Sequence, residues 1–155
     1  MLQAAHIRWG KSASSRLPEL RLLADSQAQR RRERYLADKD VFVMGDLNIP
    51  SRESPLFQAV TKRGLRVPDG LLGSPGSDLA RGKRYDQILH DPVCAGSFSK
   101  VGGVLDFYCM DHQALFPGTP MSLQEFTFQL SDHLPLWLQV VTNAADVAQG
   151  VAGPA

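Results

Sequence analysis

The longest regular pattern of hydrophobic positions predicts a helix in the first quarter of the chain. From Leu17 to about Leu36, apolar side chains recur at steps of three and four residues, the spacing of one helix face. The serines before this stretch, together with Pro18 and Glu19, are typical of a helix start. We therefore predict an amphipathic helix over residues 17–36.

Short apolar runs between turn-forming residues predict strands. Residues 2–9 form one such run, and Val41–Met44 is typical of a strand buried on both faces. After it, Gly45 allows the backbone to open into a loop. Further strands are expected at residues 85–89, 101–108, 126–130 and 136–142. Trp9 and Trp137 lie in apolar runs, so we expect both in the core.

The remaining segments predict one short helix, one long loop and a tail. Helix-starting residues at 50–54 precede an apolar pattern that ends near Gly64. Residues 67–83 are rich in glycine and proline and are long enough to form a functional surface loop. We expect one domain over residues 1–142 and a disordered tail over 143–155.

Composition limits the class of protein. With 155 residues, 43% of them apolar and 21% charged, the chain fits one globular domain. Its 17 basic and 16 acidic residues give a net charge of +1, so any affinity for phosphate must be local. No apolar run approaches the roughly 20 residues of a membrane helix. Two cysteines, Cys94 and Cys109, without a leader segment favour a reducing cytoplasm.

Candidate chemistry begins where the strand at 41–44 ends. Asp46 and Asn48 are two residues apart, so on an extended backbone their side chains point to the same side. A carboxylate there can take a proton from water, and the amide can donate to a phosphate oxygen. The alternative is an Asx turn that caps the following helix.

Two later segments carry further acids and a histidine. Ser131-Asp132-His133 precedes a strand, where Asp132 can face a hard cation and His133 a phosphoryl oxygen. The alternative is a turn with a solvated aspartate and a half-exposed histidine. Asp86 lies in a strand otherwise suited to burial and needs a partner. His133 is one candidate, and Arg84 or Lys83 is the other.

Basic residues offer weaker signals. The run 29–34 contains four arginines, but such a run on a helix is typically a solvated face. Lys83 and Arg84 flank the expected cleft and are better placed to bind a substrate phosphate. The pair Asp111-His112 lacks a strand context and is expected to lie in a loop.

Taken in order, these motifs resemble those of the endonuclease/exonuclease/phosphatase family, of the deoxyribonuclease or abasic endonuclease type. The matching pieces are Gly45-Asp46-Leu47-Asn48, Arg84-Tyr85-Asp86 and Ser131-Asp132-His133, with His6-Ile7-Arg8-Trp9 similar to an earlier histidine strand of the family. The resemblance covers about residues 5–141. It implies an α+β fold, a four-layer α/β sandwich in which two mainly antiparallel sheets pack between helices.

The resemblance also implies roles for the candidate residues. Asp46 would orient or deprotonate the attacking water, Asn48 would bind the scissile phosphate, and Asp86 would hold His133. His133 would stabilise charge on the phosphoryl oxygens. The other two assignments are Asp132 as a ligand of Mg²⁺, with Mn²⁺ as an alternative, and His6 as a second phosphate-side imidazole or general acid.

The implied activity is metal-dependent hydrolysis of phosphoester bonds by water. No nucleophilic cysteine or serine motif is evident, which agrees with direct attack by water. Nucleic acid is the leading substrate class for such a family. Small phosphoesters, inositol phosphates and phospholipid headgroups remain alternatives, because no residue is positioned by the sequence to recognise a base.

One departure from the family pattern points to a second hypothesis. Family members supply an Asn and a Glu to the metal from a segment before the histidine strand, and this chain shows no such segment. Glu19 and Glu33 lie on the predicted helix and are poor replacements. We therefore expect the N-terminal part of the domain to be missing, or to be supplied by a partner chain. The alternative function is a truncated, non-catalytic family member.

Overall fold

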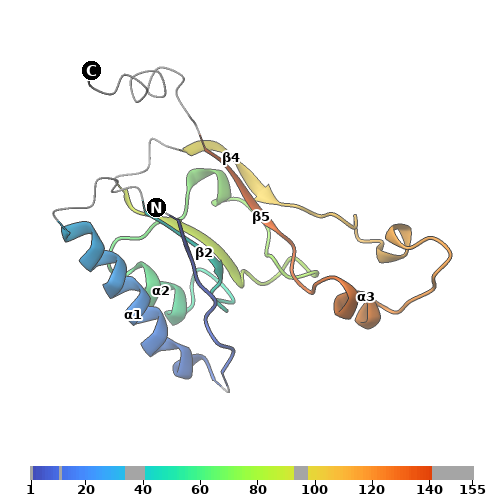
Figure 1. The fold of residues 1–155 in the computed structure, drawn as a ribbon, viewed down its shortest axis with the longest axis horizontal. Coiled ribbons are helices and arrows are strands. Elements are labelled where there is room, and N and C mark those ends of the chain that lie inside the picture. Colours follow the sequence, from blue (N-terminus) through green and yellow to red (C-terminus); the bar gives the residue numbers. More distant parts are fainter. Residues whose placement is uncertain (1, 11, 34–40, 93–97, 141–155) are drawn as a thin grey trace, which may run out of the picture.

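The computed structural model describes residues 2–10, 12–33, 41–92 and 98–140, which form an α+β fold with two sheets (Figure 1). In the first sheet the central strand β2 (Phe42–Asp46) pairs in parallel with β1 (Leu2–Ala4) and antiparallel with β3 (Asp86–His90). The second sheet pairs β4 (Phe98–Val104) antiparallel with β5 (Leu136–Val140).

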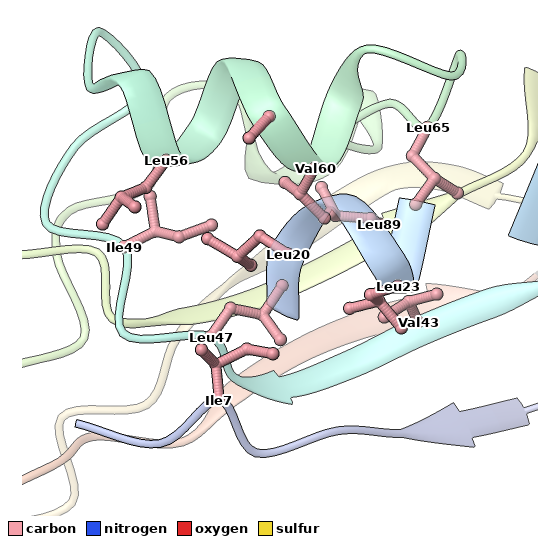
Figure 2. Close-up of a cluster of buried hydrophobic side chains, with 11 residues drawn as sticks. Ile7, Leu20, Leu23, Val43, Leu47, Ile49, Leu56, Val60, Leu65 and Leu89 are labelled. Atoms are coloured by element: carbon pink, nitrogen blue, oxygen red, sulfur yellow. The ribbon is translucent and has the colours of Figure 1, made fainter. Parts of the chain in front are cut away.

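Two helices cover one face of the first sheet. Figure 2 shows α1 (Ala13–Arg32) and α2 (Pro55–Thr61) with the main hydrophobic core between them and the strands. This core consists of Ile7, Leu20, Leu23, Val43, Leu47, Ile49, Leu56, Ala59, Val60, Leu65 and Leu89. Burial of these apolar side chains is the main force that holds the helices to the sheet.

The helix predictions hold with shifted bounds. α1 begins at Ala13, four residues before the predicted start, and residues 34–36 lie outside the described residues. α2 is capped as the sequence indicates, because the Ser54 hydroxyl accepts a hydrogen bond from the Phe57 backbone N–H at 3.2 Å. Pro55 occupies the first turn, where its missing N–H costs nothing.

The prediction that β2 is buried on both faces is wrong. Val41 and Val43 are fully buried, but Phe42 and Met44 are only half-buried, because α1 and α2 cover a single face of the sheet. Gly45 also belongs to the strand and does not open a loop. Its φ is +135°, and a Cβ there would lie 2.1 Å from the carbonyl oxygen of Ala5, so glycine permits the close approach of the neighbouring chain.

A helix replaces the strand predicted at residues 126–130. α3 (Leu123–Gln129) begins with a capping box in which the Ser122 and Glu125 side chains each bond to the other's backbone N–H. Its Phe126 is fully buried in a second, aromatic-rich cluster with Tyr108 and Leu134. A short apolar run does not distinguish a strand from a helix, and the capping box before this one favours the helix.

The remaining elements are short and lie in the loops. The 3-10 helix η1 (Asp69–Leu71) lies in the long glycine-rich loop, and η3 (His112–Leu115) follows Asp111, whose side chain caps it. The expected loop at the pair Asp111-His112 is therefore a capped turn of helix. The strand expected at 101–108 is present as β4 and ends at Val104.

Both tryptophans were wrongly predicted to be core residues. Trp9 is 62% exposed and Trp137 is 44% exposed. Trp9 lies two residues beyond Ile7, whose backbone N–H donates to the carbonyl of Asp46 at the end of β2. Trp137 lies on β5, where it lines an open cavity beside the first sheet.

The arginine run at the end of α1 is not wholly a solvated face. Arg31 pairs through Nε with the buried carboxylate of Asp91 at 2.9 Å and so ties the helix to the end of β3. The predicted disordered tail over 143–155 lies outside the described residues. Among those that are described, no helix combines the length and apolar character needed to cross a membrane.

We predict that Leu20→Ala lowers the free energy of unfolding by about 2–5 kcal/mol, because it leaves a cavity between α1 and the sheet. Leu22→Ala on the same helix is the matched control: Leu22 is 70% exposed, so its loss should change stability by less than about 0.5 kcal/mol. Urea unfolding monitored by circular dichroism measures both. Equal losses for the two variants would contradict the packing described here.

We also predict a pH dependence at the start of α3. The backbone N–H and then the hydroxyl of Ser122 lower the pKa of Glu125 below its ordinary 4.5. A lowered folded-state pKa means that this stabilisation is fully present above pH 4.5 and is lost as the pH falls through the folded value. The Ser122 amide resonance should therefore titrate below pH 4.5 and stop titrating there in Glu125→Gln. Titration of wild-type Ser122 at or above pH 4.5 would refute this.

Candidate active site

The pairing of β2 with β3 brings two carboxylates together. The antiparallel register places Asp46 directly opposite Asp86, and the backbone N–H of Leu47 continues the ladder to the carbonyl of Tyr85 at 2.9 Å. Opposed residues in a sheet have side chains on the same face. The two acids are 40 positions apart in the sequence numbering and yet share one end of the sheet.

His133 joins these acids from the segment before β5. Its Nδ1 lies 2.6 Å from Oδ2 of Asp86, a charge-assisted hydrogen bond if the ring is protonated. The predicted pairing of Asp86 with His133 is confirmed, and among the described residues Asp86 forms no ion pair with Lys83 or Arg84. A carboxylate on Nδ1 fixes the orientation of the imidazole and leaves Nε2 available to a ligand.

A loop residue that the sequence did not reveal holds this arrangement. The hydroxyl of the buried Ser77 accepts a hydrogen bond from the backbone N–H of Asp86 at 3.0 Å. The carbonyl of Ser77 accepts one from the N–H of Leu134 at 2.6 Å, and Asp78 forms a β-bridge with His133. The long loop at 67–83 therefore holds Asp86 and the segment of His133 in their relative positions. A serine in a glycine-rich loop carries no sequence signal for such a role.

Asp46, Asn48 and His6 form the other side of the site. Oδ1 of Asp46 accepts the backbone N–H of Asn48 at 2.8 Å, which is the Asx turn considered as an alternative, although Ser54 caps α2. The Asn48 amide donates to the carbonyl of Ile7 at 2.7 Å and lies 3.4 Å from Oδ2 of Asp46. Nε2 of His6 lies 3.5 Å from the same oxygen, and the His6 side chain is 76% exposed. Oδ2 of Asp46 is the less firmly held oxygen, because its contacts with Asn48 and His6 are long, at 3.4 Å and 3.5 Å.

The histidine reaches Asp46 because the chain keeps pairing with β2 beyond β1. The backbone N–H groups of Ala5 and Ile7 donate to the carbonyls of Met44 and Asp46, both at 2.9 Å. The extended conformation predicted from residue 2 onward thus carries His6 to the site, although β1 itself ends at Ala4.

Arg84 lies at the edge of the site with a second arginine. Arg84 donates to the hydroxyl of Ser74 and to the carbonyl of Pro75, both at 3.3 Å. Arg52, whose pKa is lowered first by burial and then by the charge of Arg84, donates to two carbonyls of the neighbouring loop. Both arginines line a small cavity together with Asp86. The positive charge expected from Arg84 is therefore next to the site, and Arg52 adds to it.

The donor atoms fit a divalent cation. Within the described part of the chain, one atom each of Asp46, Asp86 and His133 can be chosen so that all lie within 4.8 Å of one another. Carboxylate oxygens are the ligands that hard divalent cations prefer. Asp132, the predicted metal ligand, is exposed and is not part of this group, so its role stays a prediction.

Aromatic side chains border the imidazole, among them Trp9, which was expected in the core. The ring of Tyr85 stacks on His133 with centroids 5.7 Å apart and an interplanar angle of 25°. Trp9 meets Tyr85 edge to face at 6.0 Å. The guanidinium of the buried Arg16 lies 4.7 Å from the Trp9 centroid, and its Nη1 donates to the carbonyl of Asn48 at 2.6 Å. Arg16 thus joins α1 to the turn that follows β2.

Comparison with known proteins identifies the fold by structure and not by sequence. No protein-family model and no curated protein matches the chain. A mannosyl-6-phosphatase of Bacteroides thetaiotaomicron VPI-5482 has a similar structure, with a TM-score of 0.58 and 19% identity over 91% of this chain and 51% of that protein. A beta toxin from Staphylococcus aureus has a TM-score of 0.53 and 16% identity over 88% of this chain and 50% of its own. The chain therefore spans about half the length of each.

We predict that Arg16→Ala lowers the free energy of unfolding by about 1–3 kcal/mol, because it leaves the carbonyl of Asn48 buried without its donor. Arg21→Ala, an exposed position on the same helix, is the control and should change stability by less than about 0.5 kcal/mol. Denaturant unfolding measures both. If Arg16→Ala is as stable as the control, the bond to Asn48 does not hold the turn.

Proposed function

We propose that this chain carries the catalytic residues of a metal-dependent phosphoester hydrolase of the endonuclease/exonuclease/phosphatase type. The observation that supports it most is the hydrogen bond between Asp86 and His133 beside Asp46. The proposal is also supported by the similarity of the fold to that of a phosphatase. Neither a helix cap nor a solvated turn requires an acid–imidazole pair from two distant segments.

In this proposal Asp46 orients the attacking water and takes its proton. Its Oδ1 is held by the N–H of Asn48, while Oδ2 has only long contacts, at 3.4 Å to Asn48 and 3.5 Å to His6. A fixed carboxylate with one available oxygen is suited to a general base. His6, at the exposed end of the same contact, would bind the phosphate or deliver a proton to the leaving group.

His133 would donate from Nε2 to the phosphoryl oxygens and stabilise the charge that develops on them. Asp86 fixes the ring from the other side through Nδ1, and Tyr85 restricts its rotation by stacking. Arg84 would add positive charge at the edge of the site. The Asn48 amide is already engaged with Ile7, so to bind phosphate it would exchange its long contact with Asp46.

Asp86 and Asp132 would hold Mg²⁺, with Mn²⁺ as the alternative, and leave Asp46 to act as the base. When bound, such a cation supplies Lewis acidity toward phosphoryl oxygens and lowers the pKa of bound water. The imidazole of His133 is another candidate donor, but its Nδ1 already bonds to Asp86. We therefore assign it to the substrate.

One observation favours a second candidate, in which the chain is an incomplete, non-catalytic domain. An open apolar cavity of about 280 Å³ lies between β5 and the face of the first sheet opposite α1 and α2. It is lined by Leu2, Phe42, Met44, Ile88, Leu136, Trp137, Leu138 and Val140. Apolar sheet faces of this kind are normally covered. In the four-layer sandwich that we propose, further sheet and helix layers from an additional segment or partner chain would cover it and complete the site.

Substitution of the proposed base tests the first candidate. We predict that the wild-type chain hydrolyses plasmid DNA or an aryl phosphodiester or phosphomonoester with Mg²⁺, and that a chelator abolishes this turnover. Asp46→Asn should lower kcat by about 10²- to 10⁴-fold, because it removes the base and keeps the shape. Initial rates measured with purified protein give the comparison.

Asp69→Asn is the matched control, since Asp69 is exposed on η1 and should leave the rate unchanged. Circular dichroism of both variants confirms that they are folded. Turnover that survives the chelator, or an Asp46→Asn variant as active as Asp69→Asn, would exclude this mechanism. No turnover with any substrate would favour the incomplete, non-catalytic candidate.

A further inference from the structure

An aromatic row leads from the proposed site to the protein surface. His133 stacks with Tyr85, and Tyr85 and Trp9 meet at right angles, so the three rings are in sequence from the imidazole outward. The outer ring, Trp9, is 62% exposed although it is one of the largest apolar side chains. Exposure of a tryptophan beside a candidate active site is costly in water and favours a binding role.

Trp9 is held in place before any ligand arrives. The guanidinium of Arg16 lies 4.7 Å from its ring centroid, and Arg16 is itself buried and fixed by its bond to the carbonyl of Asn48. A cation at this distance attracts the face of an indole ring. The side chain therefore loses little freedom when a ligand stacks on it, which raises the net binding energy.

An open cavity of about 410 Å³ lies beside the ring. Its wall is formed by Arg8, Trp9, Gly10, Ser15 and Glu19. This volume falls in the range of about 300–1,000 Å³ found for small-molecule pockets. The wall offers one flat aromatic surface, a hydroxyl, a carboxylate and a guanidinium, which together suit a ring that carries polar substituents.

We propose that Trp9 is the stacking subsite for a ring in the substrate, so that the preferred phosphoesters carry a nucleobase or a sugar ring near the scissile phosphate. The inference rests on the proposed function for the identity of the reacting group. In this proposal Trp9 determines substrate specificity, and esters without a ring, such as those of glycerol, are poor substrates.

Ligand binding tests the subsite without catalysis. The chain contains two tryptophans, so in Trp137→Phe the fluorescence of Trp9 is observed alone. We expect adenosine monophosphate or glucose 6-phosphate to quench it saturably and more tightly than glycerol phosphate, by at least about fivefold for the nucleotide, since stacking of a base contributes about 1–3 kcal/mol. Preference for the first probe identifies a nucleobase, and preference for the second a sugar. Equal affinity for all three probes, or no quenching, would overturn the proposal.

Kinetics then tests specificity. Trp9→Ala should lower kcat/KM for a ring-bearing ester by about 5- to 150-fold and leave that for a ringless alkyl ester unchanged. Trp9→Phe, which keeps a ring, should retain most of the activity, and Trp137→Ala, the other exposed tryptophan, should behave as wild type. An equal loss for both esters in Trp9→Ala would indicate a structural role and refute the subsite. Ring-dependent quenching in a protein without turnover would refute the proposed function and support the subsite.

Discussion

The candidate site depends above all on the antiparallel register between β2 and β3. That register sets Asp46 opposite Asp86, and residues alternate between the two faces of a strand. Val43 and Leu89, which also pair with each other, face the helices and are fully buried. If one of the two strands shifted by one residue relative to the other, its acid would point into this core, and the two acids would no longer lie side by side. Burial of the helix-facing residues therefore fixes the position of the acids on the opposite face.

Hydrogen bonds of two residues, Ser77 and Arg16, then position the other groups of the site around the two acids. Ser77 joins the long loop both to Asp86 and to the segment that carries His133, and so brings the imidazole within hydrogen-bonding distance. On the other side Arg16 connects α1 to the turn at Asn48 and supports Trp9. The side chains of Ser77 and Arg16 are both buried, and the hydrogen bonds of buried groups are costly to leave unmade and therefore specify geometry.

The acids share their sheet face with the open apolar cavity between the two sheets. Phe42, Met44 and Ile88 alternate in phase with Asp46 and Asp86, so a layer that covers the cavity would also form a wall of the site. The similar solved structures are about twice as long as the part that this chain matches. Any layer that covers this sheet face would thus affect both the cavity and the candidate site, because a single surface carries both.

The sequence by itself determined the local elements and the chemical inventory. Hydrophobic periodicity predicted α1, apolar runs predicted β2 and β3, and Ser54 marked the start of α2. The acids and His133 were recognised as candidate site residues. All of these signals act over a few residues of the chain. The prediction of a strand at residues 126–130 was wrong, because a short apolar run does not distinguish a strand from a helix. Only the tertiary structure decided that Asp86 bonds to His133, that Ser77 and Arg16 hold the site, and that Trp9 is exposed beside it. These depend on contacts between distant segments, and no local pattern encodes which face of a sheet remains uncovered.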